Sequence, residues 1–417
     1  MSARAARVLP LVSLALLGAC RSAVVAPSGV GGSRIVFDPA PAGIAAGSDE
    51  RSCATPLVSS AGLYVIGGGR DGEPDASGLT WPSRRVSLHG PAPFSKDLRS
   101  VVWLVGATHA ARPELVLFGG YVRPFPELGP GAPRTGLFAL KLSARGDVLW
   151  RRVAENRDPE ASAIAAESVA LDADGRLLSL SPSTGIADLL GIAVAAEGDY
   201  LWRGELGAAL PPLARAGAAE TFEDFVAADA GTTYLTARER EAERAHLLQL
   251  DPQGRAAWQR EVPYWTDALA ADDAGGVWVT GSIHDRDPEA STTQRSRARV
   301  FHYDHAGRLL GELTIGGARA PRPSAAATRS IQRAAVDGRG RLWLLGHYDD
   351  SLSMGGIDLY TQGFGGRRFI AVLDAALTPL GALPIESEAE IRRVGERVLL
   401  AHGEPQERCF VHTLDVR

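Results

Sequence analysis

The amino-acid sequence predicts an all-β fold, a β-propeller of seven four-stranded blades. Three observations predict it. One strand-turn-strand segment recurs along the chain, a second kind of hairpin alternates with it, and one copy of each makes a unit of roughly 55 residues that is too small to bury both faces alone. Such units must stack around a common axis.

The recurring segment is clearest at residues 245–263, AHLLQLDPQGRAAWQREVP. It reads as an apolar strand, a tight turn at Asp251–Gly254, and a second strand that carries Trp258. Trp150 and Trp202 hold the same place in two further copies, so the tryptophans are 52 (202−150) and 56 (258−202) residues apart. This period is typical of propellers and solenoids.

The second unit is a hairpin with Asp and Gly at its turn. An Asp side chain accepts hydrogen bonds from its own turn and Gly tolerates positive φ, so an Asp-x-x-Gly between apolar runs predicts a turn. Seven such hairpins are expected, at 58–69, 111–121, 169–182, 225–238, 269–282, 334–347 and 391–403.

The two ends of the chain are expected to share one blade. The last segment, RCFVHTLDV, reads as a strand without a hairpin partner, and Ile35–Phe37 is a short strand that would supply one. Mixing terminal strands in one blade closes a propeller and removes open sheet edges.

The N-terminus has the pattern of an export signal. Arg4 and Arg7 precede an apolar run too short to span a bilayer, and Leu17-Gly18-Ala19-Cys20 resembles the bacterial lipobox. The resemblance implies cleavage before Cys20, lipidation of that cysteine, and an effectively permanent membrane anchor. An ordinary cleaved signal is the alternative. We therefore expect the chain to have three segments: a signal peptide at 1–19, a lipidated Cys20 with a flexible tether at 20–33, and the propeller at 34–417.

Two cysteines remain in the mature chain, at opposite ends of the domain. A disulfide between Cys53 and Cys409 would staple the blade that holds both termini, in a compartment oxidising enough to keep it. Two unpaired buried thiols are the alternative.

Composition indicates a folded domain outside the nucleic-acid-binding class. Hydrophobic residues make up 45%, charged residues 22%, and the net charge is −5. The 44 basic residues are scattered and offset by 49 acids, which excludes a phosphate-binding face. No cofactor motif and no metal-ligand spacing is present in the sequence, so we expect neither a cofactor nor a bound metal.

Strand direction in a propeller places the hairpin turns at one face and the long connections at the other. The long connections are expected at 70–87, 121–136, 283–298, 316–330 and 348–367, and that face is predicted to recognise a partner. Two neighbouring blades carry imidazole and carboxylate groups there. The candidate ligand-face residues are His284, Asp285, Asp287, His347, Tyr348, Asp349 and Asp350. Solvated loop residues that bind nothing are the alternative.

Part of the chain resembles a known repeat family. The run HYDDSLSMGGIDLYTQGFGGRRFIAVLD at 347–374 resembles the exported bacterial propeller repeats known as SBBP repeats. The blades with Leu-Asp-x-x-Gly-x-x-x-Trp look more like pyrroloquinoline-quinone-type repeats. Both resemblances imply a propeller and no particular reaction.

The sequence favours a binding role over an enzyme. The first hypothesis is a lipid-anchored propeller of the cell envelope that binds protein or glycan partners. By resemblance to Gram-negative lipoproteins, Arg21 after the lipidated cysteine favours the outer membrane, on its periplasmic or surface side. The alternatives are a quinoprotein-like oxidoreductase and an envelope assembly scaffold.

Overall fold

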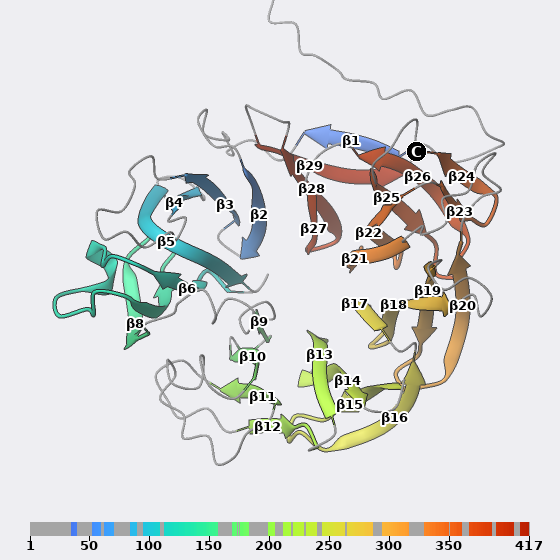
Figure 1. Cartoon of the computed structure of the whole chain (residues 1–417), viewed down its shortest axis with the longest axis horizontal. Coiled ribbons are helices and arrows are strands. Elements are labelled where there is room, and N and C mark those ends of the chain that lie inside the picture. The colour runs from blue at the N-terminus through green and yellow to red at the C-terminus, as the bar shows by residue number, and fades with distance from the viewer. Residues whose placement is uncertain are drawn as a thin grey trace, which may run out of the picture. The chain divides into compact units, whose positions relative to one another are not determined.

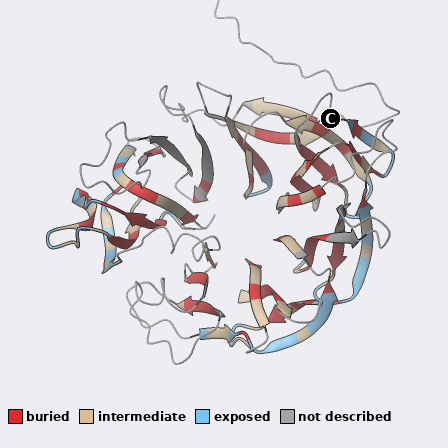
Figure 2. Cartoon of the chain, viewed as in Figure 1, coloured by how far each residue is buried: buried red, intermediate tan, exposed pale blue. Residues whose placement is uncertain are grey.

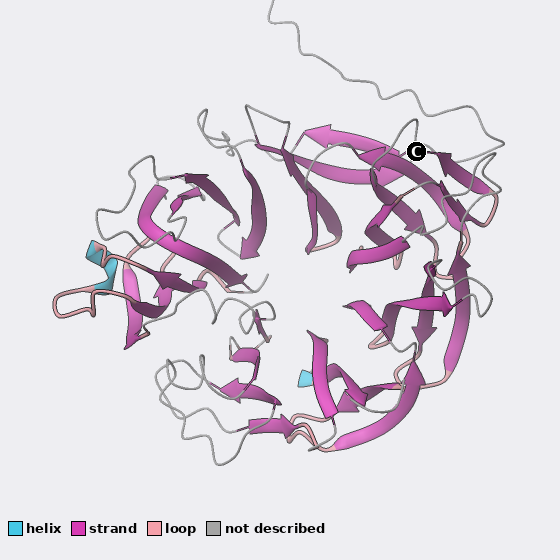
Figure 3. Cartoon of the chain, viewed as in Figure 1, coloured by secondary structure: helices cyan, strands magenta, loops and turns pink. Residues whose placement is uncertain are grey.

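The computed structural model describes residues 35–39, 52–59, 62–70, 84–89, 95–108, 112–156, 169–172, 174, 176–182, 199–204, 212–217, 220–228, 231–239, 244–262, 265–286, 294–316, 329–349, 351–360, 367–385, 389–403 and 409–416. These residues form β-strands and one short 3-10 helix, η1 (Pro126–Leu128) (Figure 3). No helix in these ranges is long and apolar enough to cross a bilayer. The predicted all-β class is therefore confirmed.

The first sheet has seven antiparallel strands. They are β2 (Ser52–Ser59), β3 (Gly62–Arg70), β4 (Arg84–His89), β5 (Ser95–Thr108), β6 (Leu115–Tyr121), β7 (Gly136–Leu142) and β8 (Val148–Glu155), in that order. Strand β5 is long enough to pair with β4 through its first half and with β6 through its second half.

Three four-stranded antiparallel sheets follow, each built from consecutive strands. One contains β9 (Val169–Leu171), β10 (Leu177–Pro182), β11 (Asp199–Gly204) and β12 (Pro212–Arg215). The next contains β13 (Glu220–Ala227), β14 (Thr233–Glu239), β15 (Ala245–Leu250) and β16 (Ala256–Val262). The third contains β17 (Trp265–Ala271), β18 (Val277–Arg286), β19 (Gln294–Tyr303) and β20 (Leu309–Ile315).

The C-terminal part forms two more four-stranded sheets and a hairpin. One sheet contains β21 (Arg329–Val336), β22 (Leu342–Tyr348), β25 (Arg367–Leu373) and β26 (Pro379–Ile385), and the hairpin is β23 (Ser351–Met354) with β24 (Ile357–Tyr360). The last sheet contains β27 (Ala389–Val394), β28 (Arg397–Gly403), β29 (Cys409–Val416) and β1 (Ile35–Pro39). Ile35 pairs with Val416, so the first and last described strands share this sheet (Figure 1).

The topology is that of a β-propeller with four-stranded antiparallel blades, but the blade count differs from the prediction. The described residues form six sheets of four or more strands, not seven blades. The two blades expected before residue 156 are one sheet, because β5 continues without a break from one half to the other. Ser100, at φ 60°, marks the bend within it.

The predicted turn chemistry is confirmed. Oδ1 of Asp251 accepts hydrogen bonds from the backbone N–H groups of Gln253 and Arg255, both at 2.9 Å. Gly254 adopts φ 79°, which glycine reaches without steric cost. Asp172 caps its turn in the same way, through the N–H groups of residues 174 and 176.

The core lies between neighbouring sheets. Four separate clusters of buried apolar side chains each lie between two consecutive sheets. The first two clusters join the β9–β12 sheet to the β13–β16 sheet, and the β13–β16 sheet to the β17–β20 sheet. The other two join the β17–β20 sheet to the β21–β26 sheet, and that sheet to the one that holds both chain ends. Trp278 and Trp343 are fully buried in two of these clusters. The outer strands β16 and β20 are largely exposed (Figure 2). Each sheet is thus stabilised chiefly by its neighbours, as in other stacked-repeat folds.

Two of the three tryptophans occupy the repeated position. Trp150 and Trp258 lie on β8 and β16, the last strands of their sheets, and each is paired just before a register shift. Trp202 lies on the third strand β11, where it is 2% exposed and pairs with Ser179. The predicted equivalence of Trp202 was therefore wrong, because the glycine spacing recurred in a different part of the blade.

The repeated position packs on the turn of the next blade. Trp258 covers Gly307, where an added Cβ would lie 2.7 Å from Cδ2 of the indole. One blade later the pair is reversed: Gly311 takes the tryptophan position, and Leu377 takes the turn-glycine position at φ 64°. An added Cβ at Gly311 would lie 2.8 Å from Cδ1 of Leu377. A large side chain from one blade fills the space that a glycine leaves in the other.

This exchange predicts a coupling between Gly311 and Leu377. Gly311→Ala should lower the free energy of unfolding by about 1 kcal/mol or less, because only the end of the Leu377 side chain must move. On a Leu377→Ala background the same change should cost close to nothing. Chemical denaturation of the two single variants and the double variant measures this, and additive effects would contradict the packing described above.

Candidate functional site

The candidate site lies on the inner strands, the first strand of each blade. Strands β13, β17, β21 and β27 contact one another in that order (Figure 1). Three of them have a register shift that leaves one residue without a cross-strand partner, at Glu223, Asp267 and Gln332. A β-bulge of this kind re-aims a side chain and is frequent beside functional sites. The bulges present polar groups from strands that otherwise supply the core.

Carboxylates on these strands bind the backbone of the next inner strand. Glu223 accepts a hydrogen bond from the N–H of Thr266 at 3.3 Å, and Asp224 accepts one from Leu269 at 3.2 Å. Asp267 repeats the arrangement one blade later, with the N–H of Ile331 at 3.3 Å. The same Oδ2 of Asp267 accepts the hydroxyl of Ser282 at 2.6 Å. These bonds hold the side chains in place between consecutive blades.

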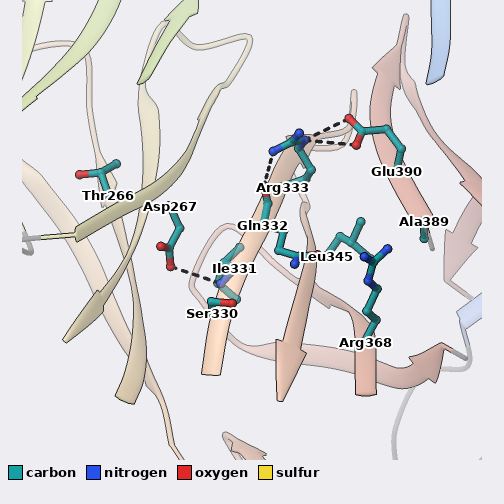
Figure 4. Close-up of a pocket in the computed structure, with 10 residues that line it drawn as sticks. All are labelled: Thr266, Asp267, Ser330, Ile331, Gln332, Arg333, Leu345, Arg368, Ala389 and Glu390. Carbon is teal, nitrogen blue, oxygen red and sulfur yellow. Dashed lines mark hydrogen bonds and ion pairs between the residues drawn. The ribbon is translucent and has the colours of Figure 1, made fainter. Parts of the chain in front are cut away.

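A cavity of about 530 Å³ adjoins this row of carboxylates. It is lined by Thr266, Asp267, Ser330, Ile331, Gln332, Arg333, Leu345, Arg368, Ala389 and Glu390 (Figure 4). We call it the inner-strand pocket. Arg333 and Glu390 form an ion pair at its edge, with Nε of Arg333 at 3.2 Å from both carboxylate oxygens of Glu390. The lining therefore offers cationic, anionic, amide and hydroxyl groups over one cavity.

Burial makes the carboxylates of the site weak acids. Removal from water raises the pKa of Asp267 to about 6 and that of Asp224 to about 6. It raises the pKa of Glu223 to about 7, against the opposing effect of Arg238 at 3.0 Å. Shifts of this size at a cavity are typical of sites that bind or react. These groups therefore ionise closer to neutral pH than ordinary carboxyl groups do.

Strand direction shows at which end of the blades two of the lining residues lie. The turns within hairpins, such as Asp251–Arg255 and Asp337–Arg341, lie at one end of the blades, which we call the turn end. There the N–H of Gly338 donates to the carbonyl of Glu396, from the turn of the next blade, at 2.8 Å. Asp267 and Glu390 lie near the start of β17 and β27, at the opposite end. This is the connection end, where the sequence predicts recognition.

The predicted ligand-face residues fall in different environments. His347 lies on β22, paired in register with Ser330 and Arg368, which both line the pocket. It lies 3.7 Å from Asp349, measured from Nδ1 to Oδ1. Tyr348 is fully buried in the core, against Phe369.

The other predicted residues are only partly described. His284 and Asp285 belong to β18, which pairs with β19 as far as Arg286. The expected loop from 283 is therefore shorter, because the hairpin extends. The side chains of His284 and Asp285, and the whole of Asp287 and Asp350, lie outside the described residues. No group of three or more His, Cys, Asp or Glu side chains in the described ranges is placed to hold a metal ion.

Sequence reasoning missed the pocket itself. The signal that points to it is a charged residue inside an apolar inner strand, as in TFEDFVA at 221–227 and TDALAA at 266–271. A half-buried carboxylate in such a strand costs free energy unless it has a hydrogen-bond or ion-pair partner, so its presence indicates either such a partner or a functional role. The β-bulges that orient these acids depend on pairing between strands. They cannot be recognised from the residue types of one strand.

The structure defines the chain as a β-propeller with a polar pocket among its inner strands. No family model and no curated protein sequence matches it. It is similar to solved structures of a streptogramin B lyase (10% identity, TM-score 0.43) and a polysaccharide-lyase-family ulvan lyase (9%, 0.45). These alignments cover 93% and 88% of this chain, and 98% and 94% of the other chains.

A prolyl endopeptidase is also similar, at 13% identity and a TM-score of 0.48, over 88% of this chain. The alignment covers 50% of the endopeptidase, so the chain spans half the length of that enzyme. Structural similarities at this level do not support an inference about the activity of this chain.

Proposed function

We propose that this chain is a lipid-anchored binding module of the cell envelope, and that its protein or glycan partner enters the inner-strand pocket. The observation that supports the pocket is its lining. Asp267, Arg333 and Glu390 come from three consecutive blades and present charges of both signs over one cavity. Few precisely placed polar groups in a concavity are what orient a bound ligand.

Partner capture with matched variants tests the pocket. Intact lipoprotein is recovered from membranes as wild type, as Arg333→Ala/Glu390→Ala, and as Arg299→Ala/Glu312→Ala, which removes an ion pair on the outer strands instead. Loss of a binding ion pair of about 2 kcal/mol lowers affinity roughly 30-fold. We expect a partner that is retained by wild type and by the outer-strand variant and lost from the pocket variant. Equal recovery from all three would overturn the proposal.

The anchor is tested separately. Mass spectrometry of the membrane-extracted protein should find an N-terminal Cys20 that carries acyl chains, and Cys20→Ala should move the protein to the soluble fraction. Three acyl chains contribute about 0.8 kcal/mol per buried CH₂, so their loss should abolish membrane retention. Membrane retention of Cys20→Ala would contradict the anchor.

We also infer that the sheet shared by the chain ends closes the propeller. Strand β2 contacts β27, β28 and β29, and β29 pairs with β1, which supports a closed ring. Cys53 is the second residue of β2 and Cys409 the first of β29, although their side chains lie outside the described residues.

The closure predicts a disulfide between Cys53 and Cys409. A crosslink over so long a loop stabilises by about 4 kcal/mol or more in the chain-entropy description. Mass spectrometry of a non-reduced digest should find one peptide pair that joins the two cysteines. Free thiols at both positions would contradict the bond.

A further inference from the structure

We propose that the ligand of the inner-strand pocket is an uncharged sugar unit of a glycan. The inference rests on the proposed function and narrows it, because it names a neutral, polyhydroxylated ligand in place of a protein or a charged glycan. Three features of the lining support it: balanced charge, polar atoms without a partner in the protein, and strand edges whose donors are already used.

The charges of the lining balance one another. The cavity is lined by two carboxylates and two guanidinium groups, those of Asp267, Glu390, Arg333 and Arg368. Two further groups beside the lining also have opposite signs. Arg392 lies 3.6 Å from Glu390, and the guanidinium of Arg333 opposes the burial that raises the pKa of Asp224 to about 6. A ligand with a net charge would leave one charge uncompensated in the cavity, so the lining favours an uncharged ligand.

Several polar atoms of the lining have no hydrogen-bond partner among the described residues. They are Oδ1 of Asp267, the side-chain amide of Gln332, the hydroxyls of Ser330 and Thr266, and Nη2 of Arg333. The hydroxyl of Thr266 is also buried. Because buried polar atoms are nearly always hydrogen-bonded, such an atom indicates a partner from outside the chain.

The surrounding contacts orient these groups. Nε of Arg333 donates to both carboxylate oxygens of Glu390 at 3.2 Å, and Nη1 donates to the carbonyl of Gln332 at 2.8 Å (Figure 4). The guanidinium is thus held with Nη2 left for a ligand, next to the amide of the bulged Gln332. Donors and acceptors placed side by side match a sugar, since each hydroxyl both donates and accepts a hydrogen bond.

Backbone donors at the pocket are already used. A peptide that adds to an open strand edge needs the free N–H groups of that edge. Here the N–H of Thr266 donates to Glu223 and that of Ile331 donates to Asp267, both at 3.3 Å. These donors of β17 and β21 are not available to an added strand, which favours a glycan over a peptide.

A glycan array tests the class of ligand. Full-length lipoprotein, in a detergent without a sugar headgroup, is applied to neutral hexose, deoxyhexose and N-acetylhexosamine oligosaccharides beside uronic-acid, sulfated and amino-sugar ones. We expect binding to neutral oligosaccharides, with an affinity that changes less than about twofold between about 0.05 M and about 0.5 M sodium chloride. Binding to none of the glycans, preference for the charged ones, or loss of binding at high salt would overturn the inference.

Matched glutamine variants test whether the sugar binds in the pocket. Gln332→Ala should weaken binding of the neutral oligosaccharide about tenfold, because it removes the amide donors and acceptor from the lining. Ser330→Ala should act in the same direction. Gln259→Ala, at an exposed position of the outer strand β16, should leave the affinity unchanged. The two amides have no described side-chain partner, so both glutamine variants should unfold at the wild-type temperature. Equal affinity of wild type, Gln332→Ala and Ser330→Ala would contradict the assignment.

Partner capture with Arg333→Ala/Glu390→Ala separates the two possible failures. If a partner is lost from this variant although no neutral glycan binds wild type, the pocket remains a binding site and the neutral sugar is wrong. If neither experiment detects binding that depends on the pocket, the proposed function and the inference are both wrong.

Discussion

Arg203→Ala should lower the free energy of unfolding by about 3–5 kcal/mol, the largest effect we expect of a single substitution. Arg203 is buried on β11, and its Nε and Nη2 donate to Oδ2 of Asp172 at 2.9 and 2.7 Å. Its Nη1 donates to the carbonyl of Gly231, in the turn of the next blade, at 3.1 Å. The variant leaves Asp172, 2% exposed, without its buried cation.

Arg176→Ala is the matched control for this change. Arg176 also donates to Oδ2 of Asp172, at 2.9 Å, but its side chain is 35% exposed. An ion pair open to water contributes about 1 kcal/mol or less. Burial opposes ionisation of Asp172, yet hydrogen bonds from the backbone of Arg176 and from both arginines hold its pKa below the ordinary value. Denaturant unfolding at neutral pH compares the two variants, and similar losses would contradict the assigned role of Arg203.

Asp267→Asn should stabilise the protein at pH 8, in contrast to most changes in a folded domain. Burial raises the pKa of Asp267 from 3.8 to about 6, so the folded state holds its proton more tightly than the unfolded state. Stability is therefore highest below about pH 4 and is lost as pH rises through 6. The shift sets an upper bound of roughly 3 kcal/mol, and partial exposure reduces the expected gain to about 1–2 kcal/mol.

The gain from Asp267→Asn should disappear as pH falls from 6 to 4. Thermal unfolding at pH 8, 6 and 4 measures it. Asp358→Asn, at an exposed position of β24, is the control and should change stability by about 0.5 kcal/mol or less throughout. Destabilisation by Asp267→Asn at pH 8 would show that this carboxylate serves the fold. A gain in stability would show that Asp267 lowers the stability of the fold, as functional residues often do.

Local chemistry explains why the fold was predictable. An aspartate such as Asp251 caps its own turn, and Gly254 supplies the positive φ that the turn needs, so both residues carry the signal within four positions. The pairing of the first strand with the last was predicted because the last strand had no hairpin partner of its own in the sequence. Neither inference required knowledge of distant contacts.

The blade count failed for a reason that the residue types do not show. Strand β5 passes from one half of its sheet to the other at Ser100, with neither Gly nor Pro at the bend. Trp202 was misplaced because a glycine spacing matched by coincidence. The pocket depends on bulges at Glu223, Asp267 and Gln332, which arise from pairing between strands and are invisible in a single strand.

Site-specific photo-crosslinking in the envelope tests the central claim most directly. A photoreactive residue replaces Gln332, the bulged residue of the pocket, or Gln253, an exposed residue of the turn end. We expect a crosslinked protein or glycan adduct from position 332 and none from 253. An adduct from 253 without one from 332, or no adduct from either, would contradict a partner that binds in the inner-strand pocket.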